Sequence, residues 1–405
     1  MAQNVSMRKD YSPFSPGVPV PPEFFVGRRQ EVEELLARGR AAKRGRVETA
    51  FLVGGRGIGK SSLASFVRRL MQTQERMLAV HVFLGGVSEL DEMTKRVFDR
   101  LLNDAITQPW HERLRDLLKD HVKQVGLFGI GLEFAAGKRE LQSITTGFGR
   151  ALGGVLERAR PDVEGMLLIL DDINGLANTP AFADWLKTTV DDIATRDVVL
   201  PLCLVLVGLP ERRTALVEAQ PSLARLLTPV VLEPWADDET DEFFASTLRK
   251  VDVTVDADAL PTLRGYSGGL PVLAHEIGDA AFTADTDNRI DRGDAFVGVA
   301  RAAVVVGRQY LEPRVYEAIR SQRYRAILRK LAEMREPIRR VQLSASVDDE
   351  QRKVVDNFLT KMKRLDVLTA DREAGPGAYR FTNALYRLYM RMEAAGATHR
   401  RADAE

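Results

Sequence analysis

The sequence predicts an α/β sandwich with a mostly parallel sheet, followed by two smaller and mainly helical domains. Short apolar runs alternate with segments of helical spacing through the first 235 residues, which is the pattern of a parallel sheet covered by helices. Beyond them, helical segments follow one another without a strand, and the chain ends in a helical, basic part with a short β-like segment. At 405 residues the chain is also too long for a single core, so two or three domains are expected.

Five apolar runs have the length of buried parallel strands, at residues 49–53, 78–84, 166–170, 202–207 and 230–232. Helical spacing predicts helices over 61–72, 92–105, 144–158 and 181–193. After Trp235 we expect helices over 237–249 and 271–284 with no strand between them. Residues 324–332 and 354–365 predict two more helices, and 367–381 predict a hairpin with its tip at 371–377.

These elements suggest a division of the chain into five parts. Residues 1–22 are rich in proline and predict an extended arm. We expect a nucleotide-binding core over 23–235, a helical lid over 236–310, a further domain over 311–395 and a tail over 396–405.

The composition is ordinary for a soluble globular protein, with 45% apolar and 28% charged residues. A formal net charge of +1 gives no global attraction to nucleic acid or membranes, so any basic patch must be local. Cys203 is the single cysteine and lies in an apolar run, which predicts a buried, inert thiol and fits a reducing cytoplasm. The first 22 residues lack the apolar core of a signal peptide, and no apolar run reaches the roughly 18 residues of a membrane span.

A glycine-rich segment with the pattern G-x-x-x-x-G-K-[ST] follows the first predicted strand and opens the first predicted helix. Its glycines let backbone N–H groups face phosphates, and the helix presents its positive N-terminus to the same anion. Lys60 would reach the β- and γ-phosphates and the Ser61 hydroxyl would ligate Mg²⁺. The segment therefore predicts a site for ATP, with GTP as the less favoured nucleotide. The residues expected to bind it are Gly54, Gly55, Arg56, Gly57, Ile58, Gly59, Lys60, Ser61 and Ser62.

The third predicted strand ends in two carboxylates, Asp171 and Asp172. Asp171 would hold Mg²⁺, directly or through water, and Asp172 would face the γ-phosphate and orient the attacking water. An ordinary helix cap after a strand is the alternative interpretation. The glycine-rich segment upstream favours the metal and catalytic roles.

In this order the motifs resemble the AAA+ and STAND class of P-loop ATPases, especially the bacterial ATPases related to the archaeal Orc1/Cdc6 initiators. Residues 25–31 resemble the box that precedes the P-loop and lines the adenine pocket, 205–211 resemble the sensor-1 strand, and 268–271 resemble the G-x-P motif of the lid. The resemblance implies a P-loop NTPase αβα sandwich, a helical lid, a winged helix domain and hydrolysis of Mg-ATP. It adds Val26, Gly27, Arg28 and Pro271 to the nucleotide-binding residues.

Several positions depart from the pattern of that class. Motor proteins of the class usually carry Glu after the Mg²⁺ aspartate, whereas this chain has Asp172, whose side chain is one methylene shorter. Gly208 stands near the place of the polar sensor-1 residue, and Val272 and Leu273 stand where a sensor-2 arginine is expected. His275 is the nearest polar residue, and we expect it on the helix surface. These departures favour a slow switch over a fast motor.

Arg225 lies between the fourth and fifth predicted strands, where AAA+ proteins place an arginine finger. The resemblance implies that it completes the catalytic site of a neighbouring subunit, which requires a homo-oligomer in the ATP state. Arg212 and Arg213 are alternatives, and a solvated surface arginine fits the sequence equally well.

The C-terminal part resembles the winged helix domain expected after an Orc1/Cdc6-like ATPase. Residues 311–405 hold 20 Lys and Arg against 14 Asp and Glu, a net charge of +6. The basic residues on the helix and wing that contact DNA in such domains are Lys353, Lys361, Lys363, Arg364 and Arg372. A solvated helix face, or a winged helix that locks the nucleotide domain closed, would show the same pattern.

Two functions of different classes therefore stay open. The first is a regulatory ATPase switch that hydrolyses slowly and acts through a protein partner. The second is an initiator or transposition helper that ATP loads onto DNA. A nucleotide-gated scaffold without useful hydrolysis is a third possibility, which a turnover assay would separate from the first.

Overall fold

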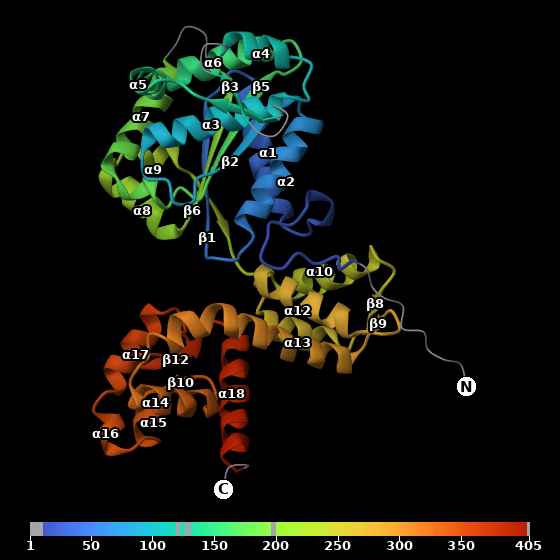
Figure 1. Ribbon diagram of the computed structural model, residues 1–405, viewed down its shortest axis with the longest axis vertical. Coiled ribbons are helices and arrows are strands. Elements are labelled where there is room, and N and C mark those ends of the chain that lie inside the picture. The colour runs from blue at the N-terminus through green and yellow to red at the C-terminus, as the bar shows by residue number, and fades with distance from the viewer. Residues whose placement is uncertain (1–10, 119–121, 126–130, 196–199, 403–405) are drawn as a thin grey trace. The chain divides into compact units, whose positions relative to one another are not determined.

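The computed structural model describes residues 11–402, apart from 119–121, 126–130 and 196–199 (Figure 1). The chain divides into two compact units, one made of residues 19–233 and the other of residues up to 18 together with 234–405. The finer boundaries expected from the sequence stay predictions, and parts of the expected arm and tail, 1–10 and 403–405, lie outside the described residues.

A five-stranded parallel sheet forms the centre of the first unit and confirms the predicted fold class. Its strand order is β2-β5-β6-β1-β7, so the first strand in sequence lies between the last two. The strands form from short apolar runs, which are buried on both faces in β1, β2, β5 and β6, whereas the edge strand β7 is exposed on one face. Their bounds are Glu48–Gly54 for β1, Met77–Phe83 for β2, Gly165–Asp171 for β5, Leu202–Gly208 for β6 and Pro229–Leu232 for β7.

Helices cover both faces of this sheet, with α1 and α2 on one side and α7 and α8 on the other (Figure 1). Buried side chains of α3, α6 and α7 form one core with alternate strand residues such as Phe51, Leu168 and Leu170. The helices of this unit are α1 Arg29–Lys43, α2 Lys60–Thr73, α3 Leu90–Ala105, α4 His111–Leu117, α5 Lys138–Thr146, α6 Phe148–Ala159, α7 Pro180–Ala194, α8 Pro210–Ala219 and α9 Leu223–Leu226. A short 3₁₀ turn, Pro22–Phe24, and an antiparallel hairpin, β3 Val122–Val125 with β4 Gly131–Phe134, complete it.

One predicted helix of this unit is wrong in its extent. The segment 144–158 is not a continuous helix, because α5 ends at Thr146 and α6 begins at Phe148. Gly147 caps both helices with φ −94° and ψ 30°, which lies outside the helical region. Glycine loses more backbone entropy in a helix than any other residue, so the chain turns there.

The second unit contains α10 Asp237–Arg249, α11 Leu260–Ser267, α12 Pro271–Ala284 and α13 Arg292–Val306, which continues into a π-helical segment, Gly307–Tyr316. The expectation of no strand between the first helices is wrong. Thr254–Val255 forms β8, which pairs in parallel with β9, Arg289–Ile290. Two-residue strands carry no detectable alternation, so the sequence pattern could not reveal them.

The last part of the chain adds α14 Gln322–Glu333, α15 Arg340–Ala345, α16 Asp349–Arg352, α17 Val355–Arg364 and α18 Ala384–Ala402. The predicted hairpin is confirmed, since β11 Leu368–Ala370 pairs antiparallel with β12 Ala378–Phe381. A third strand that the pattern did not indicate, β10 Ile338–Arg339, pairs with β12 on its other side. This part has its own hydrophobic core, which includes Ile327, Phe358 and Phe381.

The N-terminal arm is packed into the second unit through Phe14, which is 5% exposed. Its ring contacts Phe243, Phe244 and His275 at centroid distances of 5.8, 6.3 and 6.1 Å. Gly278 permits the approach, because a Cβ at that position would lie 2.4 Å from the Phe14 ring.

Candidate nucleotide-binding site

The glycine-rich loop connects β1 to α2 in the order that the sequence predicted. Gly57 and Gly59 have φ angles of +72° and +90°, a region that side chains with a Cβ rarely adopt. These two glycines let the loop curl and end at the first residue of α2, which is 14 residues long. Free backbone N–H groups at a helix N-terminus attract an anion such as a phosphate.

The rest of the loop is fixed by close packing beneath it. A Cβ on Gly54 would lie 2.8 Å from Cγ2 of Ile58 and 2.9 Å from the carbonyl oxygen of Leu232 on β7. Ile58 is buried and anchors the loop from below. Gly55 and Arg56, in contrast, are exposed, so the upper side of the loop faces solvent.

Lys60 lies at the start of α2 and closes over the loop. Its Nζ donates to the carbonyl oxygens of Gly54 at 2.9 Å and Gly55 at 2.7 Å. Burial lowers the pKa of Lys60, and the nearby carboxylates of Asp171 and Asp172 act in the opposite direction. The structure therefore brings the lysine and both predicted carboxylates to one place.

Ser61 and Ser62 follow Lys60 in the first turn of α2. The Oγ of Ser62 accepts a hydrogen bond from the backbone N–H of Val20 at 3.1 Å, a contact that the sequence did not indicate. Val20 is buried, so this bond attaches the end of the arm to the P-loop helix.

Asp171 is the last residue of β5 and is only 2% exposed. It follows Leu170, which belongs to the core with α3, α6 and α7, and strand alternation turns Asp171 to the opposite face, toward α1 and α2. Its Oδ2 lies 2.9 Å from Nε2 of His81 on β2. His81 is 3% exposed and was not singled out from the sequence, where it looks like one polar interruption of an apolar strand.

Asp172 follows in a left-handed conformation, with φ +57°, and is exposed. Asn174 donates to Oδ1 of Asp172, and its own Oδ1 accepts from the backbone N–H of Leu209 at 3.2 Å. This amide lies beside Gly208 at the end of β6, where a Cβ would stand 3.5 Å from the Asn174 oxygen. The sequence shows Gly208 near the place of the polar sensor-1 residue, but in the structure Asn174 supplies a polar group at this strand end.

The box before the P-loop folds around Arg28. Gly27 and Arg28 have φ angles of +78° and +61°, and α1 begins at the next residue. The buried Arg28 guanidinium donates to the carbonyl oxygen of Glu233 at 2.6 Å and to that of Ile58 at 3.5 Å. Its side chain therefore supports the P-loop from below. The preceding Phe25, next to Val26, stacks on Phe66 of α2 at 4.5 Å.

Among the arginine-finger candidates, Arg225 on α9 is exposed. Within the part of the chain that the structure describes, its guanidinium has no hydrogen bond or ion pair. The two alternatives are engaged inside the unit, because Arg212 donates to Asn178 and Arg213 donates to the carbonyl oxygen of Leu227 at 2.8 Å.

Pro271 is the first residue of α12 in the other compact unit and is buried. The expectation that His275 lies on the helix surface is wrong, since it is 4% exposed. Its Nδ1 accepts from the backbone N–H of Ser15 at 3.1 Å, and its ring contacts Phe14 and Phe243. The sequence pattern missed this because α12 is covered on several sides, including by the arm.

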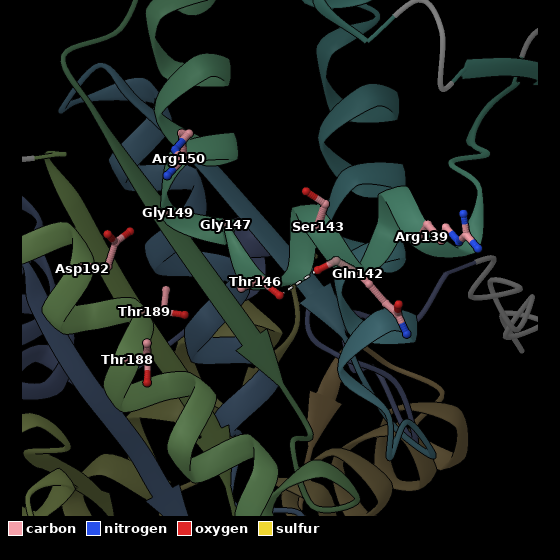
Figure 2. A pocket seen from close by; sticks show the side chains of 10 residues that line it. All are labelled: Arg139, Gln142, Ser143, Thr146, Gly147, Gly149, Arg150, Thr188, Thr189 and Asp192. Carbon is pink, nitrogen blue, oxygen red and sulfur yellow. Dashed lines mark hydrogen bonds between the residues drawn. The ribbon is translucent and has the colours of Figure 1, made fainter.

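A separate polar cavity of about 520 Å³ lies where α5, α6 and α7 meet (Figure 2). It contains none of the predicted nucleotide-binding residues. Thr189 and Asp192 line one side, and Arg139 points away from them at the far end. The thiol of Cys203 is buried as expected, and burial raises its pKa to about 12. None of the described helices is long and apolar enough to cross a membrane.

A parallel sheet with a P-loop at the end of β1 and a carboxylate at the end of β5, and with β6 between these two strands, is the arrangement of a P-loop nucleotide hydrolase. Comparison with family models gives the same answer, since residues 25–205 match the AAA ATPase domain. The protein is therefore an ATPase, and its residues 25–205 are similar to the AAA ATPase domain.

Solved structures show the same fold over nearly the whole chain. The Walker-type ATPase PABY2304 of Pyrococcus abyssi is 17% identical, with a TM-score of 0.54, and the match covers 91% of this chain and 97% of that one. The ORC2 protein of Aeropyrum pernix, solved in ADPNP and ADP complexes, is 15% identical, with a TM-score of 0.56 and 98% of both chains covered. No curated protein matches the sequence.

Proposed function

We propose that the protein is a slow, Mg-ATP-dependent regulatory switch. ATP is bound by the P-loop residues 54–62, and Lys60 contacts its β- and γ-phosphates. The adenine lies against Val26, Gly27 and Arg28, and the role of Pro271 stays a prediction from the sequence.

The residues present fit a magnesium ion. The Ser61 hydroxyl and the Asp171 carboxylate are hard oxygen donors, and Mg²⁺ is usually held by one or two protein groups together with phosphates and water. Mg²⁺ bound there would neutralise charge that develops on the phosphates. The protein's own part is to place the phosphates with Lys60 and to orient water with Asp172.

The geometry of Asp172 is the observation that carries the slow-switch proposal. Its short carboxylate stands on left-handed backbone and is bonded to Asn174. A base tied in this way reaches the attacking water less readily than a glutamate on ordinary backbone. We infer that hydrolysis acts as a timer for a change of state, which a protein partner reads.

Asp172→Asn tests this proposal, because asparagine tolerates the left-handed backbone and removes only the charge. We expect unchanged Mg-ATP affinity and turnover lowered by at least about tenfold. Limited proteolysis should give one pattern with the analogue ADPNP and another with ADP. With ATP, the wild type should pass from the first pattern to the second at its turnover rate, and the variant should stay in the first. Identical patterns in both nucleotides, or full turnover in the variant, would refute the switch.

ATP-dependent DNA binding is the second candidate function. The order α14, β10, α15, α17, β11, β12 supports the winged helix expected from the sequence, and Lys363, Arg364 and Arg372 are exposed on α17 and on the hairpin tip. These three side chains have no hydrogen bond or ion pair among the described residues.

The exposed Arg225 also fits a proposed homo-oligomer in the ATP state, in which this arginine completes the site of a neighbouring subunit.

A further inference from the structure

The contact between His81 and Asp171 joins two strands that are far apart in the sequence. β2 pairs with β5 in parallel, with Phe83 opposite Asp171. His81 lies two residues before Phe83, so its side chain emerges on the same face of the sheet and reaches the carboxylate diagonally. The His81 ring also contacts Phe83 at 4.4 Å, which fixes its orientation.

Both partners are almost completely buried, since each side chain is only 3% exposed. Every neighbour of His81 along β2 from Met77 to Val82 is apolar, so an apolar side chain would suit the strand better as packing. A buried imidazole is unfavourable unless its nitrogens are hydrogen-bonded. This position therefore carries an imidazole, and among the described residues the side chain within hydrogen-bond distance of it is Asp171.

The contacts of the Asp171 carboxylate connect β2 with the P-loop. Oδ2 receives the His81 Nε2 contact. The carboxylate also acts electrostatically on the ammonium of Lys60 in the P-loop. A histidine that holds one oxygen of a ligating carboxylate fixes the direction of the other.

We propose that His81 is a positioning residue for the magnesium ligand Asp171. Its Nε2–H donates to Oδ2 and holds the carboxylate in one orientation, in which its other oxygen would be available to Mg²⁺. The inference rests on the proposed Mg-ATP function of the site and adds to it a residue that does not touch nucleotide or metal.

The test measures the affinity of the full-length protein for ADP, with Mg²⁺ titrated from zero in the presence of a chelator. ADP is used so that hydrolysis plays no part in the readout. The informative pair of variants is His81→Gln and His81→Asn. Both are polar amides, but only the glutamine nitrogen reaches the place of Nε2.

We expect His81→Asn to raise the Mg²⁺ concentration needed for half-maximal enhancement of ADP affinity by about tenfold or more. His81→Gln should stay within about threefold of the wild type, and ADP affinity without Mg²⁺ should be the same in all three proteins. In an Asp171→Asn background, His81→Asn should add nothing, because its effect passes through that carboxylate.

Thr94→Val is the matched control for lost stability. Thr94 lies on α3, away from the P-loop, and its buried hydroxyl accepts a hydrogen bond from the Thr145 hydroxyl at 3.0 Å. The valine removes that acceptor. Thermal unfolding of all variants separates folding from metal response, and Thr94→Val should unfold earlier without any change in Mg²⁺ dependence.

Equal Mg²⁺ dependence in wild type and His81→Asn, or equal shifts in the Asn and Gln variants, would overturn the role of His81. A loss that persists in the Asp171→Asn background would overturn it as well. A wild-type protein whose ADP affinity ignores Mg²⁺ would instead refute the proposed function itself.

Discussion

His275 shows how one buried residue joins the arm to the second unit. Its ring lies among Phe14 and Phe243, and its Nδ1 accepts the backbone N–H of Ser15. Burial lowers the pKa of His275 to about 4. The folded protein therefore holds a neutral imidazole at pH values where the unfolded chain would already bind a proton.

This difference makes stability depend on pH in a defined window. The unfolded state binds the extra proton between about pH 6.5 and 4, so the free energy of unfolding falls as the pH is lowered through that range. The shift corresponds to a loss of about 3 kcal/mol, complete near pH 4. Urea unfolding at several pH values checks it, with His275→Gln as the comparison. Carboxylates titrate in both proteins, so the difference between the two curves isolates the histidine; parallel curves would contradict the assignment.

At the scale of elements, α17 and the wing decide between DNA binding and a purely regulatory role. Lys361 is already engaged, because its Nζ donates to the carbonyl oxygen of Ala318 at 2.6 Å and lies 5.9 Å from the centroid of the Tyr324 ring. Lys353 is bonded to Glu350 on α16. Lys363 and Arg364, at the exposed end of α17, are therefore the residues to change.

If this surface binds DNA, affinity should fall with salt by about 0.9 log units per tenfold salt for each phosphate neutralised. Lys363→Ala with Arg364→Ala should flatten that slope by about two contacts and leave ATP turnover unchanged. Arg329→Ala with Lys330→Ala, on the exposed face of α14, is a control of equal charge. DNA affinity is measured at two salt concentrations. An unchanged slope, or faster ATP turnover in the α17 variant, would point instead to a domain that locks the nucleotide domain.

The sequence predicted the elements whose signals are local. The five sheet strands are apolar runs, and the P-loop and Asp171 follow two of them directly, so each could be recognised from a few neighbouring residues. The break at Gly147 was missed because helical spacing continues across it. The strands β8 and β10 were missed because two residues are too few to show an alternating pattern.

Contacts between distant segments could not be predicted in the same way. His81 and Asp171 are 90 residues apart, and only the pairing of β2 with β5 brings them together. His275 and Ser15 are 260 residues apart, and the arm that buries the histidine carries no sign of its docking place. In both cases the residue type was visible and the partner was not.

At the scale of the whole molecule, the central claim is that one site on the first unit binds Mg-ATP. Lys60 tests it most directly, because the role of its ammonium in phosphate binding requires no assumption about the second unit. Among the described residues, the Lys60 ammonium donates hydrogen bonds to two loop carbonyls, so its removal should leave the fold intact.

The decisive measurement is the affinity of purified Lys60→Ala for ATP in the presence of Mg²⁺, by calorimetric titration. The lost hydrogen bond between the ammonium and a phosphate contributes about 1.5–3 kcal/mol, so the ATP affinity should fall by roughly 10- to 100-fold. The variant should still unfold cooperatively. Arg69→Ala, an exposed arginine of the same helix, should bind ATP as the wild type does. A folded Lys60→Ala protein that binds Mg-ATP as tightly as the wild type would contradict the account.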